Sequence, residues 1–186
     1  MHKTVQNLVN IENKIKSNLS DLSKANLPNI IAVYKTFKID KILPLIDHGH
    51  LNFGENKVQE AVDKWTDIKK EKPNIQLHMI GGLQTNKVRF AVKLFDFIHS
   101  VDSQKLAKKI ASEQNKINKK IKIFIQVNIG DESQKSGINK NDLNDLVLCT
   151  KELDLNIMGL MCIPPIHVNP TSLFKEMSEL NKSFKF

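Results

Sequence analysis

Residues 30–35 read Ile30-Ile31-Ala32-Val33-Tyr34-Lys35, an apolar run that ends abruptly at a lysine. The run does not alternate apolar and polar residues, so it predicts a strand buried on both faces, as in a parallel sheet. Parallel α/β sheets carry their chemistry at the carboxyl ends of the strands, which is where Lys35 lies. A lysine amine at such an end is a candidate for imine formation with a carbonyl group. The plainer and commoner alternative is a strand-end lysine that reaches into solvent.

The same pattern recurs along the chain. Short apolar runs alternate with stretches whose apolar residues recur every three or four positions, as on one face of a helix. The expected strands cover residues 30–34, 51–54, 75–80, 95–98, 121–127 and 157–161, and the expected helices cover about 5–22, 39–48, 56–72, 88–94, 103–117, 142–153 and 171–183. This alternation predicts right-handed βαβ units in an α/β fold of the (β/α)8 TIM-barrel type, with about six of its eight strands. We expect one domain over residues 1–186, because no linker divides the chain.

Composition indicates a globular chain. The 186 residues are 40% hydrophobic and 26% charged. No stretch approaches the ~18 apolar residues of a membrane span, and the polar N-terminus lacks the apolar centre of a signal peptide, so we expect a cytoplasmic protein without a membrane partner. Cys149 and Cys162 do not have the spacing of a zinc site or a redox pair.

The net charge of +8 raises the question of nucleic-acid binding. The lysines are dispersed, Arg89 is the only arginine, and aromatic residues make up only 6% of the chain. Bidentate arginines and clustered aromatic residues are what specific recognition uses. We therefore expect no specific nucleic-acid partner, although weak, salt-sensitive attraction stays open.

The ends of the expected strands are chemically rich, and in a barrel these ends converge on one rim. The strand ends carry Lys35, Gly54-Glu55-Asn56, Gly81-Gly82, His99-Ser100-Val101-Asp102, Asn128 with Asp131, Glu132 and Lys135, and Gly159-Leu160-Met161. Asn and Glu side chains beside Lys35 could orient a bound ring, and Lys87 and Lys135 could reach the same rim.

Competing motifs are incomplete. The segment 82–87 lacks the second glycine that a P-loop has before its lysine. His48 and His50 have no nearby cluster of metal ligands. His78 lies within an expected strand, where a hydrogen-bonded core residue is the better interpretation.

Seven segments together resemble the pyridoxal phosphate homeostasis proteins, small single-domain relatives of the alanine racemase barrel. They are Ile31–Thr36, Phe53–Glu60, His78–Lys87, His99–Asp102, Gln126–Ile129, Lys135–Ile138 and Gly159–Pro164, in the family's order. None is specific alone, but together they cover nearly the whole chain.

The resemblance implies a Schiff base between Lys35 and pyridoxal 5′-phosphate, with Asn56 beside the cofactor ring. It implies a protein that binds, buffers or delivers the cofactor without robust catalysis. Two alternatives stay open: a racemase-like enzyme acting on amino acids, and a degenerate remnant that binds the cofactor weakly.

The family continues past its sixth strand with a Ser-Met-Gly-Met-Ser-type segment and an Arg-x-Gly segment, which supply most of the phosphate contacts. Neither segment occurs before Phe186. We therefore expect strands one and six to be open edges, through which the chain could self-associate.

Overall fold

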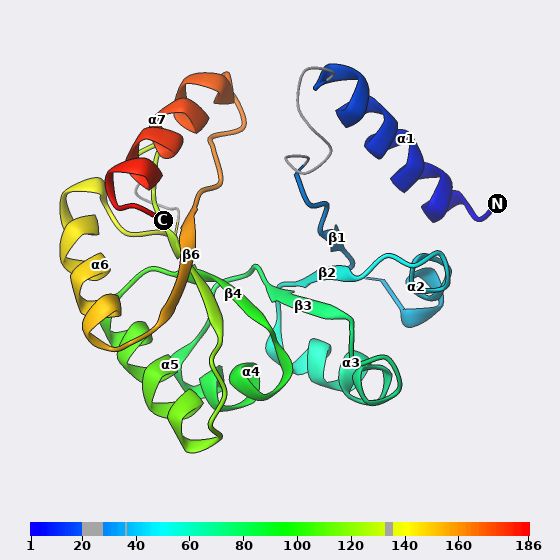
Figure 1. Ribbon diagram of the computed structural model, residues 1–186, viewed down its shortest axis with the longest axis horizontal. Helices are drawn as coiled ribbons and strands as arrows, with labels where there is room; N and C mark the ends of the chain where they lie inside the picture. The colour runs from blue at the N-terminus through cyan, green and yellow to red at the C-terminus, as the bar shows by residue number, and fades with distance from the viewer. Residues whose placement is uncertain (20–27, 36, 133–135) are drawn as a thin grey trace.

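The computed structural model describes residues 1–19, 28–35, 37–132 and 136–186. Strands and helices alternate in this part of the chain, as Figure 1 shows. The strands are β1 (Ala32–Val33), β2 (Asn52–Glu55), β3 (Gln76–Met79), β4 (Phe97–Val101), β5 (Lys122–Gln126) and β6 (Asn156–Met161). The α-helices are α1 (Lys3–Asn18), α2 (Leu43–Asp47), α3 (Val58–Glu71), α4 (Val88–Leu94), α5 (Gln104–Lys116), α6 (Leu143–Glu152) and α7 (Pro170–Ser183). Short 3-10 turns, η2 (Ile39–Lys41), η3 (Thr85–Lys87) and η4 (Lys140–Asp142), precede α2, α4 and α6.

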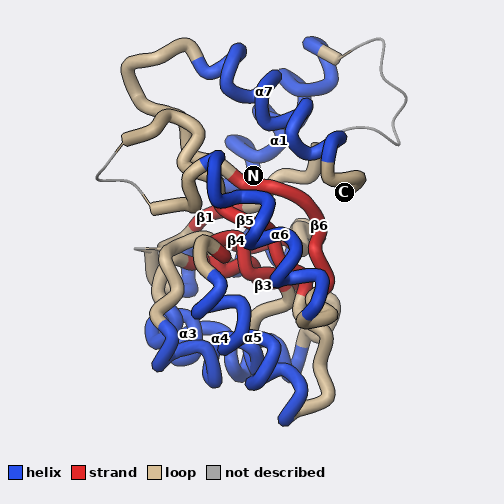
Figure 2. Tube along the Cα trace, turned by 90° about the vertical axis from the view of Figure 1, so that its left-hand side faces the viewer, coloured by secondary structure: helices blue, strands red, loops and turns tan. Residues whose placement is uncertain are grey.

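The six strands of the described residues form one parallel sheet in the order β1-β2-β3-β4-β5-β6. Each strand pairs with the next one in the chain, and a helix lies in each connection, as in a (β/α) barrel. Figure 1 shows α3, α4, α5 and α6 outside the curve of the sheet, and the turned view of Figure 2 shows α3, α4 and α5 side by side. The predicted α/β fold of the barrel type, with about six strands, is confirmed.

The main core lies between the sheet and these outer helices. Burying an apolar side chain there contributes about 1.5–3 kcal/mol. The largest fully buried side chains are Trp65, Phe53, Phe95, Ile42, Ile75, Leu77, Met79, Ile98, Ile110, Ile121, Ile123 and Ile125. None of the described helices combines the length and the apolar composition needed to span a bilayer.

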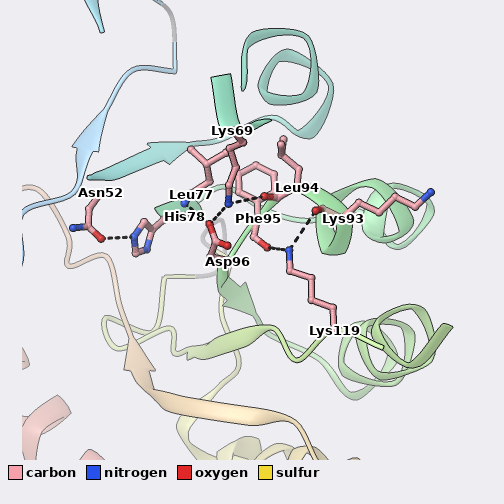
Figure 3. Close-up of polar contacts among 9 residues, drawn as sticks. All are labelled: Asn52, Lys69, Leu77, His78, Lys93, Leu94, Phe95, Asp96 and Lys119. Carbon is pink, nitrogen blue, oxygen red and sulfur yellow. Dashed lines mark hydrogen bonds and ion pairs between the residues drawn. The ribbon is translucent and has the colours of Figure 1, made fainter. Parts of the chain in front are cut away.

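A polar network joins α3, α4, β3 and β4 near the amino ends of the strands (Figure 3). Asp96 Oδ2 accepts hydrogen bonds from the Leu77 backbone N–H at 2.8 Å and from Lys69 Nζ at 2.5 Å. Lys119 Nζ donates to the carbonyl of Phe95 at 2.8 Å, just past the end of α4, and burial lowers the pKa of Lys119. Amines near a helix C-terminus satisfy its free carbonyls. This end of the sheet is therefore held by structural lysines.

Two predictions about strands were wrong. The strand at residues 30–34 is not buried on both faces: β1 is an edge strand of the described sheet and Val33 is 43% exposed. The fourth strand begins at Phe97 instead of Phe95, because the Phe95 N–H bonds Ala91 O at 2.9 Å and so ends α4. His99 and Ser100 are consequently strand residues, not rim residues. Leu22, predicted on the first helix, lies outside the described residues.

Candidate functional site

The two faces of β2 are distinguished by their contacts. Glu55 points to α3, where it bonds Trp65 Nε1. Gly54 faces the opposite way: a Cβ built on it would lie 3.1–3.4 Å from side-chain atoms of Ile31, Val33 and Ile80. Since side chains alternate along a strand, Asn56 belongs to the same interior face as Gly54.

Lys35 lies at the level of Asn56. Val33 pairs with Gly54, and two residues further along each strand are Lys35 and Asn56. The Tyr34 N–H bonds Gly54 O at 3.3 Å, so the pairing continues one residue past β1. The chain then turns, with the Phe37 N–H bonded to Tyr34 O at 3.2 Å. Lys35 is exposed, and its amine has no hydrogen-bond or ion-pair partner among the described residues.

Asn56 offers an unused acceptor. Its Oδ1 atom is buried and has no hydrogen-bond partner in the described part of the chain. Gly81, which follows β3, packs directly on the backbone of Asn56. A Cβ added to Gly81 would lie 2.4 Å from the Asn56 carbonyl oxygen. The Ile80 N–H also bonds Glu55 O at 2.9 Å, so the two chain segments are held together at this point. A buried amide oxygen without a donor is costly, which makes Asn56 a candidate ligand contact.

A cavity of about 210 Å³ opens beside Gly81 at the carboxyl ends of β3 and β5. Gln126 Nε2 donates to Ser136 O at 3.2 Å across it. The segment after β5 turns back, and its Ile138 N–H bonds Gln126 O at 2.8 Å. The cavity is lined by Ile80, Gly81, Gly82, Gln126, Val127, Asn128, Ser136 and Ile163. Backbone amides and side-chain amides in such a pocket can bind a small polar ligand.

Below the rim, two histidines fill the interior face. His78 Nε2 is 3.1 Å from Asn52 Oδ1, so it donates there, and His99 Nε2 then donates to His78 Nδ1 at 2.9 Å. His78 stacks on Phe97 and His99 on Phe124. Burial lowers the pKa of each histidine to about 4. The prediction that His78 is a hydrogen-bonded core residue is confirmed.

The register places Lys35 and Asn56 at the same level of neighbouring strands, but not every predicted rim residue lies with them. Glu55 does not face the rim, so the expectation that this glutamate orients a ring beside Lys35 was wrong; strand alternation turns it to α3. Lys87 ends η3 above β3, and Lys135 lies outside the described residues. Sequence reasoning missed the contact of Gly81 with Asn56, although the Gly81-Gly82 pair was a visible signal. No group of three or more possible metal ligands occurs among the described residues.

Comparison with known proteins identifies the family of the chain. Residues 11–183 match the family described as alanine racemase, N-terminal domain. The pyridoxal phosphate homeostasis protein of Vibrio cholerae is 35% identical over 98% of this chain and 80% of the relative. That of Escherichia coli is 34% identical over 88% of this chain and 71% of the relative.

Solved structures show the same relationship. PipY of Synechococcus elongatus without PLP aligns with a TM-score of 0.74 at 31% identity, over 91% of this chain and 80% of PipY. PipY with PLP bound aligns with a TM-score of 0.72 at 29% identity, over 92% of this chain and 82% of PipY. An alanine racemase of Clostridium difficile, at 14% identity and a TM-score of 0.65, shares the fold alone.

The fold and the sequence matches define a protein of the alanine racemase N-terminal type. Within that class, the chain belongs to the pyridoxal phosphate homeostasis protein family.

Proposed function

We propose that this protein binds pyridoxal 5′-phosphate and serves cofactor homeostasis, by buffering or delivering the cofactor. The names of the relatives and the PLP-bound structure of PipY support this proposal. Lys35 provides the amine and Asn56 lies beside the cofactor ring. The bound cofactor supplies an aldehyde, with which a primary amine condenses.

The observation that carries the proposal is the unpartnered Asn56 Oδ1 at the level of a free lysine amine. The residues present fit the cofactor: Lys35 supplies a nucleophile without a competing carboxylate, and Asn56 supplies an acceptor shielded from water. Gly81 and Gly82 line the nearby cavity.

We propose binding without robust turnover. Racemisation needs acid–base groups on both faces of the reacting carbon. Three titratable side chains of β2, β3 and β4 are held in other contacts: Glu55 bonds Trp65 of α3, and His78 and His99 bond each other. Measurable turnover of L-alanine by the purified protein would favour the racemase alternative instead.

The test is covalent trapping. We expect a visible absorption band on adding pyridoxal 5′-phosphate, and borohydride reduction should place the label on Lys35 by mass spectrometry. Lys35→Ala should abolish the label, whereas Lys87→Ala, a change at another lysine that follows a strand, should keep it. A label that persists in Lys35→Ala would contradict the assignment to this residue.

Thermal melting of the same protein with added cofactor distinguishes tight binding from a degenerate remnant. A ligand that binds only the folded state raises the melting temperature with its concentration. We expect such a rise with pyridoxal 5′-phosphate in the wild type and a smaller one in Lys35→Ala. A melting temperature independent of the cofactor would favour the remnant.

We also propose a cytoplasmic setting, a single domain over residues 1–186 and no specific nucleic-acid partner. The dispersed lysines and the single arginine support the last point. Self-association through the β1 and β6 edges is a further proposal, supported by their position at the ends of the described sheet. Analytical ultracentrifugation at several protein concentrations tests it.

A further inference from the structure

The strand that presents Lys35 has little main-chain support. β1 spans two residues and pairs only with β2 in the described sheet. One backbone bond, from Tyr34 N–H to Gly54 O at 3.3 Å, continues this pairing toward Lys35. A short edge strand of this kind opens easily, because few buried contacts hold it. An interaction from outside the sheet would therefore restrict where Lys35 lies.

A side chain of α3 supplies that interaction. Lys64 Nζ donates to the carbonyl oxygen of Tyr34 at 2.9 Å. The same amine donates to Glu55 Oε1 at 2.7 Å. Tyr34 immediately precedes Lys35, and Glu55 immediately precedes Asn56. One ammonium group thus joins the two backbone positions that carry the candidate site.

The bridge that Lys64 forms between Tyr34 O and Glu55 Oε1 is buried at its Glu55 end. Glu55 is fully buried, and Oε1 also accepts a hydrogen bond from Trp65 Nε1 at 2.9 Å. Trp65 is fully buried as well, and the Lys64 side chain is 13% exposed. Glu55 Oε2 has no hydrogen-bond partner among the described residues, so its second oxygen makes no competing contact with the protein. Charge-assisted bonds shielded from water are stronger and more directional than exposed ones.

We propose that Lys64 and Glu55 are positioning residues that fix the end of β1, so that the Lys35 amine stays at the level of Asn56. The inference rests on the proposed role of Lys35. Neither residue touches the cofactor; both act through the backbone. The alternative is that the pair contributes only to overall stability.

Helix α3 offers a matched control. Lys69, five residues further along, forms an ion pair with Asp96 at 2.5 Å, and its side chain is 18% exposed. The two lysines are similarly shielded, but Asp96 is 22% exposed whereas Glu55 is fully buried, and this pair lies at the amino ends of the strands. Lys64→Met and Lys69→Met therefore remove similar interactions from the same helix at opposite ends of the sheet.

The first measurement is cofactor binding with borohydride mapping. Losing one charge-assisted hydrogen bond that orders the site should weaken binding at Lys35 about tenfold in Lys64→Met. Lys69→Met should lower the melting temperature but keep the affinity and the Lys35 label. Equal losses of affinity in both variants would mean that the Lys64–Glu55 pair contributes only to overall stability, and would overturn the proposal.

The second measurement needs no cofactor. Hydrogen exchange of the Tyr34 amide, which bonds Gly54 O, should be about tenfold faster in Lys64→Met than in Lys69→Met. Unchanged exchange there would overturn the positioning role even if the wild type binds cofactor. If exchange is faster in Lys64→Met but the wild type forms no Lys35 label, the positioning role is upheld and the proposed function is contradicted.

A second variant covers the case in which Lys64→Met fails to fold. Removing one partner leaves Glu55 buried with an uncompensated charge, whereas replacing both partners avoids that cost. The double variant Glu55→Gln/Lys64→Met keeps an acceptor for Trp65 and still lacks the bond to Tyr34. It should show the same fast exchange at β1; protection equal to that of the wild type would overturn the proposal.

Discussion

Replacing Gly81 by alanine should damage the candidate site through the backbone of Asn56. A Cβ at position 81 would lie 2.4 Å from the Asn56 carbonyl oxygen and 2.8 Å from its Cα and Cβ atoms. The nearest atoms belong to the main chain, so a rotamer change cannot relieve the clash. The chain must move instead, and overpacking of this kind costs about 1–3 kcal/mol.

The adjacent glycine is the control. Nothing lies within 4 Å of a Cβ built on Gly82, and alanine there reduces the entropy of the unfolded chain. For a chain of this size, 1 kcal/mol corresponds to about 2–4 °C in melting temperature. Gly81→Ala should therefore melt about 2–12 °C below the wild type, whereas Gly82→Ala should melt at or above the wild-type temperature.

Binding of pyridoxal 5′-phosphate provides the second assay. Because Gly81→Ala displaces Asn56, it should weaken binding about as much as Asn56→Ala, on the order of tenfold for one lost hydrogen bond. Gly82→Ala should bind like the wild type. If Gly81→Ala matches Gly82→Ala in both melting and binding, the contact between Gly81 and Asn56 does not shape the site.

Two further predictions concern stability. The pKa of His78 and His99 is about 4 in the folded protein against 6.5 ordinarily, so below pH 6.5 the unfolded chain takes up protons first. The free energy of unfolding should therefore fall as the pH is lowered from 6.5 to 4.5, by an amount on the order of a few kcal/mol; urea titrations should show a flatter profile for His78→Asn/His99→Phe. Asn181 Oδ1 accepts the Leu160 N–H of β6 at 3.1 Å, so Asn181→Ala should cost about 1–3 kcal/mol in urea unfolding; an unchanged midpoint would mean that water replaces this bond.

Much of the fold could be predicted because periodicity is a local property. The apolar run before Lys35 and its repeats along the chain predicted parallel strands and their order. The boundary of β4 could not be predicted, because an apolar residue such as Phe95 fits the start of a buried strand as well as the end of a helix. A backbone hydrogen bond decides it: the Phe95 N–H bonds Ala91 O and so completes α4, which the apolar pattern does not show.

The candidate site was predictable only in part. Lys35 and Asn56 follow from their position at strand ends and from the family motifs. The contact of Gly81 with Asn56 depends on how two strand ends meet, and the bond from Lys64 to Tyr34 joins residues 30 positions apart. No local pattern carries that information.

Glu55 shows why strand geometry bears on function as well as fold. In the sequence it stands beside Asn56 at a strand end, where a carboxylate could serve as an acid or a base. Alternation along β2 sends the two side chains to opposite faces, so Asn56 faces the interior and Glu55 bonds Lys64 and Trp65. The Glu55 carboxylate therefore lies on the face of the sheet opposite to Asn56, where it bonds Lys64, which in turn bonds the Tyr34 carbonyl before Lys35. A site with a free amine and an amide acceptor, and with the Glu55 carboxylate turned away, is suited to holding a carbonyl cofactor more than to moving protons on it.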